Sequence, residues 1–170
     1  MKTQIIGYSG SGKSTLADRL ARVQGISVLH IDCVHWLPGW TARPSAESSA
    51  IIGDFLDTHD AWVIDGNYTS HHYSRRMEEA DQIILMNFNR FACLWRAFRR
   101  RLQYHGKARS SMTEGCPEKL DLPFIWWILH EGRTHRTKER YRALAKTYPD
   151  KFVTIRNQKE LDAFYANNHL

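Results

Sequence analysis

The stretch Lys2-Thr-Gln-Ile-Ile6, followed directly by Gly7-Tyr-Ser-Gly-Ser-Gly-Lys-Ser14, joins a strand-like run to a glycine-rich loop. The loop has the pattern G-x-x-x-x-G-K-S, in which glycines let the backbone approach a ligand where a side chain would obstruct it. The pattern is typical of a phosphate-binding loop, with Lys13 reaching the β- and γ-phosphates and the Ser14 hydroxyl reaching Mg²⁺. Apolar residues at helical spacing over 14–21 add a helix whose N-terminus faces the phosphates. The stretch predicts a nucleoside triphosphate site.

The backbone amides of such a loop turn inward and donate to phosphate oxygens. ATP and Mg²⁺ are the expected cofactors, and the metal is expected beside Ser14. The residues of this segment expected to contact the nucleotide are Gly7, Ser9, Gly10, Ser11, Gly12, Lys13, Ser14 and Thr15.

Short β-branched runs alternate with helical periodicity along the chain, which favours an α/β domain with a mainly parallel sheet. The expected strands are residues 2–6, 27–31, 62–64, 82–86 and 152–155. Further helices are expected at 45–57, where Ser45 is the predicted cap, and at 89–104, 122–147 and 159–166. The predicted architecture is a three-layer, doubly wound, five-stranded parallel sheet of the P-loop NTP hydrolase and kinase type.

At 170 residues the chain is long enough for one domain with a sizeable core. We expect a single P-loop kinase-like domain over 1–170, with a lid-like excursion at about 105–120. No apolar run approaches the roughly 20 residues of a membrane span, so no membrane partner is expected. The three cysteines are far apart, which favours neither a disulfide framework nor a zinc site. A reducing, cytoplasmic setting is the expectation.

Two aspartates follow predicted strands. Asp65 comes directly after Trp62-Val-Ile64, where phosphate-loop enzymes place an aspartate that holds the metal; an ordinary Asp-Gly turn is the alternative interpretation. Asp32 ends the strand after the first helix and could take the proton of an attacking hydroxyl, as a general base does, or only cap a turn. Ligands of doubly wound sheets bind beyond the carboxyl ends of the strands, so both carboxylates and the loop are expected at one crevice.

The net charge of +6 is concentrated in residues 90–109, which hold seven arginines and lysines and no acidic residue. On a helix, Arg96, Arg99 and Arg100 are spaced i, i+3 and i+4 and share a face. Guanidinium groups on one face suit phosphate oxygens, so Arg96 and Arg109 are expected to bind nucleotide and Arg100 to assist catalysis. A solvated basic face is the alternative interpretation. The residues expected on the buried side of this helix are Phe91, Leu94, Trp95, Phe98 and Leu102.

Together these segments resemble the nucleoside monophosphate kinase-like branch of the P-loop kinases. More closely, and over nearly its whole length, the chain is similar to the bacterial topology modulation proteins, also called adenylate kinase-like proteins. The segments that carry this resemblance are 30–32, 35–36, 38–40, 43–44, 62–68 and 115–121.

The resemblance implies an ATP-dependent kinase in which Lys13, Asp32, Asp65 and Arg100 serve transfer of the γ-phosphoryl group. The chain departs from adenylate kinases at Asn67-Tyr68, where those enzymes have Phe-Pro-Arg, so the acceptor is an unidentified small molecule. The family name suggests an effect on DNA topology. A nucleotide-dependent DNA-binding protein is therefore the alternative hypothesis, although the sequence holds no helix-turn-helix or zinc finger.

Overall fold

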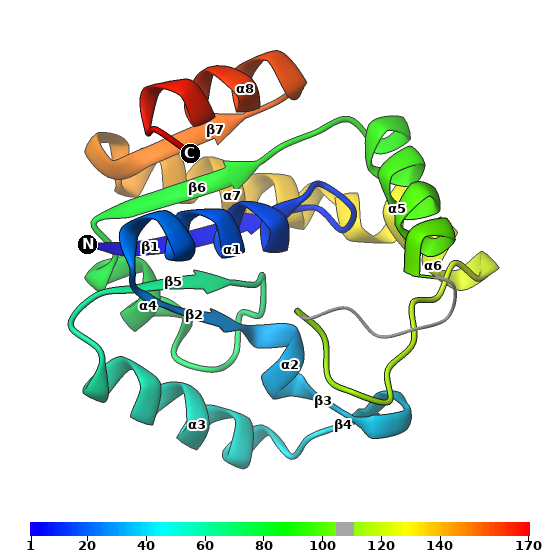
Figure 1. Ribbon diagram of the computed structural model, residues 1–170, viewed down its shortest axis with the longest axis horizontal. Coiled ribbons are helices and arrows are strands. Elements are labelled where there is room, and N and C mark those ends of the chain that lie inside the picture. Colours follow the sequence, from blue (N-terminus) through cyan, green and yellow to red (C-terminus); the bar gives the residue numbers. More distant parts are fainter. Residues whose placement is uncertain (105–110) are drawn as a thin grey trace.

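A computed structural model describes residues 1–104 and 111–170 and contains a five-stranded parallel sheet in the order β2-β5-β1-β6-β7 (Figure 1). Its strands are β1 (Lys2–Gly7), β2 (Ser27–His30), β5 (Trp62–Asp65), β6 (Gln82–Met86) and β7 (Phe152–Ile155). A separate antiparallel pair joins β3 (Trp36–Leu37) to β4 (Thr41–Ala42). The predicted five-stranded parallel sheet is confirmed.

Helices cover both faces of this sheet. The longer ones are α1 (Lys13–Gln24), α3 (Ser45–Thr58), α4 (Tyr73–Glu79), α5 (Arg90–Tyr104), α6 (Leu122–Leu129), α7 (His135–Thr147) and α8 (Gln158–Asn167). The short ones are α2 (Ile31–His35) and the 3-10 turns η1 (Pro38–Trp40), η2 (Glu131–Arg133) and η3 (Pro149–Lys151). In Figure 1, α1 lies in front of β1, while α4 and α7 lie behind the sheet. The central strands are buried on both faces, which explains their continuous apolar runs.

The predicted helix over 122–147 is wrong, because the chain turns between α6 and α7. His130 leaves the helical region with φ −132° and ψ −69°. Arg133 then turns back, and its Nε donates to the carbonyl oxygen of Ile128 at 3.0 Å, which satisfies a carbonyl at the end of α6. The Thr134 hydroxyl accepts from the Thr137 amide at 3.2 Å and caps the start of α7.

The predicted buried side of α5 is also wrong except at Leu94, which is partly buried and packs against the core. The stripe of Phe91, Trp95, Phe98 and Leu102 faces outward, and Phe91 and Trp95 are 71% and 60% exposed. The buried residues of α5 are the small Cys93 and Ala97. A Cβ on Gly10 would collide with the backbone carbonyl oxygen of Cys93, so the backbone of α5 touches the loop directly at this point.

Three smaller features differ from the sequence prediction. Ser45 is the first residue of α3 rather than its cap, a position that Pro44 occupies without a side-chain bond. Helices α2 and α4 were not predicted, because with five and seven residues each is too short to show an apolar repeat at helical spacing. Among the described residues of the expected excursion, 111–120 contain turns and no helix or strand, which agrees with an irregular segment.

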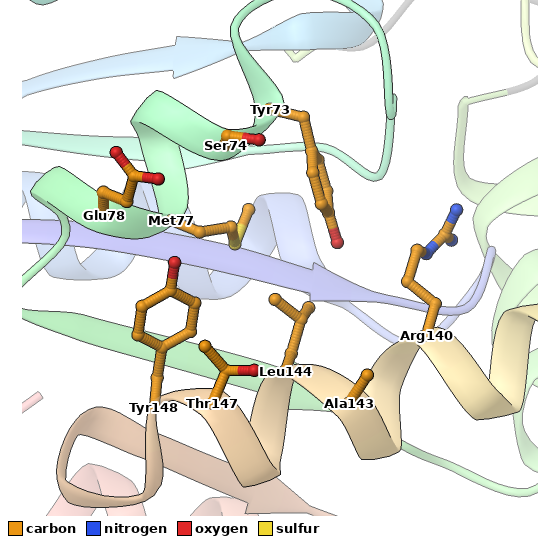
Figure 2. Close-up of a pocket in the computed structure, with 9 residues that line it drawn as sticks. All are labelled: Tyr73, Ser74, Met77, Glu78, Arg140, Ala143, Leu144, Thr147 and Tyr148. Atoms are coloured by element: carbon orange, nitrogen blue, oxygen red, sulfur yellow. The ribbon is translucent and has the colours of Figure 1, made fainter.

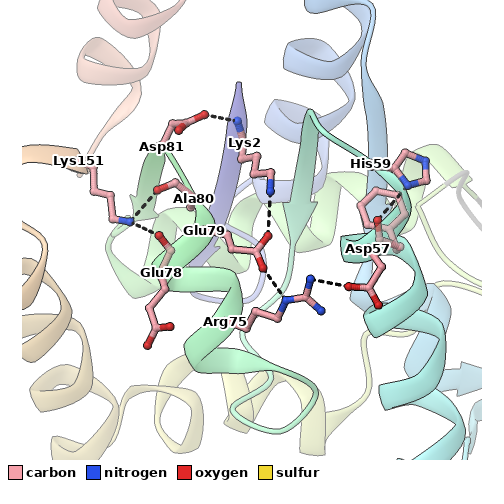
Figure 3. A network of polar contacts seen from close by, with 10 residues as sticks. Lys2, Asp57, His59, Arg75, Glu78, Glu79, Ala80, Asp81 and Lys151 are labelled. Carbon is pink, nitrogen blue, oxygen red and sulfur yellow. Dashed lines mark hydrogen bonds and ion pairs between the residues drawn. The ribbon is translucent and has the colours of Figure 1, made fainter.

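A polar network fixes the amino-terminal end of the sheet (Figure 3). The Lys2 ammonium donates to Glu79 at 2.9 Å, and Glu79 also accepts from Arg75, whose NH2 group reaches Asp57 at 2.7 Å. The Lys2 backbone amide donates to Asp81 at 2.6 Å. These bonds hold Arg75 at the end of β1 opposite the phosphate loop.

No helix in the described part of the chain is long and apolar enough to cross a membrane.

Candidate active site

The glycine-rich loop connects the end of β1 at Gly7 to the start of α1 at Lys13. Gly10 and Gly12 have φ of 77° and 98°, a region that favours glycine, so the loop needs them where they stand. No side chain caps α1, and its first turn contains no acidic residue. The amides at this helix end are therefore left to bind an anion. Lys13 folds over the loop and donates to the Tyr8 carbonyl oxygen at 3.2 Å.

A chain of polar contacts runs from the loop into β5 and β2. The Ser14 hydroxyl donates to Asp65 Oδ2 at 2.6 Å. His30 Nδ1 lies 3.3 Å from the same oxygen, and His30 Nε2 lies 2.8 Å from Asp18 Oδ1. The parallel register places His30 directly opposite Asp65. The histidine therefore fixes the carboxylate that faces Ser14.

The charges of Asp65 and His30 in this series of polar contacts stabilise each other. Burial alone would raise the pKa of Asp65, but the His30 hydrogen bond and the Lys13 charge together hold it below its ordinary value. Burial would lower the pKa of His30, and its bonds to Asp65 and Asp18 outweigh burial and raise it. Asp65 is thus a carboxylate whose charge the site supports.

Mg²⁺ fits this arrangement. The cation prefers oxygen ligands and is usually held by one or two carboxylates together with substrate phosphates. Asp65 Oδ1 is buried and has no hydrogen-bond partner within the described part of the chain, so it can take a water of the metal or the metal itself. No cluster of three His, Cys, Asp or Glu residues among the described residues could hold a metal ion by itself. A cation here would depend on phosphate oxygens.

Asp32 lies in α2, two residues beyond His30, rather than at the end of a strand. The Tyr68 hydroxyl donates to Asp32 Oδ1 at 3.0 Å. Burial and the negative charge of Asp32 raise the pKa of Tyr68, so the phenol keeps its proton. The His35 ring packs 4.6 Å from the Tyr68 ring, and its Nδ1 is buried with no partner among the residues described. Asp32 is therefore held by the Tyr68 phenol, on which the His35 ring packs.

The loop after β5 is tied to the phosphate loop. Asn67 exchanges two hydrogen bonds with Gly7: its Oδ1 accepts from the Gly7 amide at 2.9 Å, and its Nδ2 donates to the Gly7 carbonyl. Arg76 lies beneath, fully buried, and donates to Gln4 and to the Tyr68 carbonyl. Burial lowers the pKa of Arg76 to about 10. Arg76 therefore supports this loop from its buried side through the hydrogen bond to the Tyr68 carbonyl.

The predicted arginines take different positions. Arg96 turns inward, where NH1 donates to the Ser11 carbonyl at 2.6 Å and the guanidinium lies 3.9 Å from the Phe88 ring centre. Arg100 instead donates to the buried Glu118 at 2.9 Å, which joins α5 to the segment before α6. Arg109 lies outside the described residues.

The structure brings Lys13, Ser14, Asp65 and Arg96 to the phosphate loop, whereas Arg100 pairs with Glu118. Sequence reasoning missed His30 and Asn67, although His30 is a polar residue at the carboxyl end of β2 and Asn67 follows β5 by two residues. The Arg133 guanidinium, a weaker candidate for phosphate binding from the sequence, lies 3.8 Å from the centre of the Tyr8 ring in the loop.

No protein-family model matches the chain, and no curated protein matches it. Solved structures do. A deoxyadenosine kinase from M. mycoides, with dCMP and a flexible dCDP bound as products, aligns over 99% of this chain and 98% of that chain, with 12% identity and a TM-score of 0.50. A gluconokinase from Sinorhizobium meliloti 1021 aligns over 99% and 95%, with 16% identity and a TM-score of 0.49. The similarity to the first shows that this chain has the P-loop kinase fold.

Proposed function

We propose that the protein is a kinase that moves the γ-phosphoryl group of ATP to a small hydroxyl-bearing acceptor. The observation that carries this proposal is the 2.6 Å bond between Ser14 and the buried carboxylate of Asp65, at the start of a helix with no cap of its own. A hydroxyl and a carboxylate beside a phosphate loop are the arrangement with which phosphoryl-transfer enzymes hold Mg²⁺ and phosphate together.

In this proposal the loop amides and Lys13 bind the β- and γ-phosphates, and Ser14 with Asp65 holds Mg²⁺. When bound, Mg²⁺ neutralises charge on the phosphate oxygens. His30 is a positioning residue, since it contacts Asp65 and not the phosphates. Arg96 stiffens the loop through Ser11.

Asp32 acts on the acceptor. The acceptor oxygen forms a bond to the γ-phosphorus while the bond from that phosphorus to the bridging oxygen of ADP breaks. The hydroxyl proton passes to the Asp32 carboxylate, which Tyr68 orients through its own hydrogen bond. The deoxyadenosine kinase of the same fold is named for a hydroxyl-bearing acceptor, which agrees with a group of this kind at Asp32.

The segments of resemblance support a place among the adenylate kinase-like topology modulation proteins, in a cytoplasmic setting and as one domain. The predicted lid at about 105–120 lies partly outside the described residues. The inward turn of Arg96 toward Ser11 favours the kinase over the DNA-binding hypothesis. An arginine that served DNA would face solvent.

The test is a transfer screen with γ-labelled ATP and Mg²⁺ against nucleosides, nucleoside monophosphates and sugars. We expect one hydroxyl compound to be labelled by the wild-type protein and not by Asp32→Asn. A control variant, Asp54→Asn, changes an exposed aspartate of α3 and should keep full activity. If the wild-type protein and Asp32→Asn both transferred the labelled phosphoryl group only to water, and at equal rates, the proposed acceptor chemistry would be contradicted.

A further inference from the structure

A groove opens between α4 and α7, behind the sheet as Figure 1 shows it (Figure 2). Its floor includes Met77 and Leu144, which are both buried. Tyr73 and Arg140 lie toward the end of the groove where β1 finishes, whereas Glu78 and Tyr148 lie toward the other end (Figure 2). The groove is thus apolar along its floor and carries a cation near the phosphate-loop end.

Polar atoms at that end have no partner. The Tyr73 hydroxyl and Arg140 Nε are buried and make no hydrogen bond within the described part of the chain. The Tyr141 hydroxyl, beyond Arg140 and outside the groove lining, interacts instead with Arg140 and Asn67. The Arg140 guanidinium lies 5.5 Å from the Tyr141 ring centre. Proteins pair about nine-tenths of such buried groups, so the two in the groove lining, Tyr73 and Arg140, indicate a binding partner from outside.

The missing partner has a definite chemistry. Burial raises the pKa of Tyr73 and raises that of Tyr141 to about 12, against the opposing charge of Arg140 in both cases, so both phenols keep their protons. A guanidinium only donates hydrogen bonds, and a protonated phenol has one donor to offer. Donors gathered around a positive charge are complementary to an oxyanion.

We propose that this groove is a binding site for a small organic anion. The carboxylate or phosphate of the ligand binds Arg140 and Tyr73, and its apolar body lies along Met77 and Leu144. This site is distinct from the phosphate loop and goes beyond the proposed kinase activity, which does not require it.

Contacts link the groove to the loop. Tyr141 packs edge-on against Tyr8, with ring centres 5.6 Å apart. On the other side, α4 follows the segment in which Asn67 bonds Gly7. Both walls of the groove therefore reach the nucleotide site, so an occupant is expected to change ATP affinity, and ATP to change its affinity by the same factor.

The test is calorimetric titration of the whole protein with benzoate, phenyl phosphate and, as the uncharged control, benzyl alcohol. We expect both anions to bind more tightly than the alcohol. Arg140→Gln should weaken them by about tenfold or more, because it removes a charge-assisted bond. Tyr73→Phe, which keeps the shape of the groove, should weaken them by a smaller factor.

Two matched variants separate this site from the rest of the molecule. Arg142→Gln changes an exposed arginine of the same helix, with a side chain 72% exposed, and should leave binding unchanged. Lys13→Ala should weaken ATP binding by about tenfold or more and retain benzoate binding, so failure of the kinase proposal and failure of this one are distinguishable. Benzyl alcohol binding as tightly as benzoate, or anion binding that survives Arg140→Gln and is lost in Lys13→Ala, would overturn the proposal.

Discussion

At the scale of single residues, the candidate site depends on one carboxylate. Asp65 accepts from Ser14, is contacted by His30 and keeps a second buried oxygen without a partner among the described residues. Sequence spacing alone predicted Asp65 and Ser14. It could not predict His30, because the contact exists only after β2 pairs with β5 and the register sets His30 opposite Asp65.

Asp65→Asn should reduce Mg²⁺-dependent turnover by about a hundredfold, because the metal loses a negative neighbour and His30 loses its charged partner. Titrating the rate with Mg²⁺ measures this. The half-saturating Mg²⁺ concentration should rise in Asp65→Asn and stay unchanged in Asp54→Asn. An unchanged Mg²⁺ dependence in Asp65→Asn would remove the carboxylate from the metal site.

Asp32→Asn should separate binding from transfer. The amide keeps the size of the side chain and can still bond Tyr68, but it cannot take up a proton. We expect ATP affinity within a factor of two or so of wild type and transfer slower by about two to four powers of ten. Loss of ATP affinity in this variant would place Asp32 at the nucleotide instead.

At the scale of elements, the strands could be predicted from their apolar runs, because both faces of the sheet are covered. The buried face of α5 could not be predicted from the spacing of its apolar residues. Its apolar stripe has helical spacing, yet the buried residues are Cys93 and Ala97, and the backbone of Cys93 lies against Gly10. The break between α6 and α7 depends likewise on Arg133 turning back to Ile128, a contact that no local pattern in the sequence signals.

The two sides of α5 should respond to substitution in opposite ways. Trp95→Gln should change the free energy of unfolding by less than about 1 kcal/mol, because the side chain is already exposed. Ala97→Leu should cost about 1–3 kcal/mol, because it overfills the contact with the core. Urea unfolding of both variants compares them. A larger loss in Trp95→Gln would show that the stripe is buried in solution.

At the scale of the whole molecule, the sheet is fixed at both ends. The loops bind one another at its carboxyl end through Asn67 and Gly7, and the ion network of Lys2, Glu79 and Arg75 fastens the amino-terminal end (Figure 3). The sequence indicated the carboxyl end through the glycine-rich motif. It gave no sign of the network, which joins residues far apart in the chain.

Through Glu79, this network makes the free energy of unfolding depend on pH in the acidic range. The hydrogen bonds from Lys2 and then Arg75 hold the pKa of Glu79 below its ordinary 4.5. A depressed pKa contributes stability that is fully present above the unfolded-state pKa and is lost as the pH falls through the folded-state value. Urea unfolding between pH 7 and pH 3 should therefore show a shallower acid loss in Glu79→Gln than in wild type. Parallel curves would mean that the network contributes nothing.

The central claim, that the glycine-rich loop binds MgATP, is tested most directly by calorimetry on wild-type protein and Lys13→Ala. Lys13 is a cation within the loop, and a charge-assisted bond is worth about 1.5–3 kcal/mol, or roughly ten- to a hundredfold in affinity. We predict a loss of at least that size, with Arg22→Ala at the exposed end of α1 as the unaffected control. MgATP binding of equal affinity in Lys13→Ala and wild type would contradict the account.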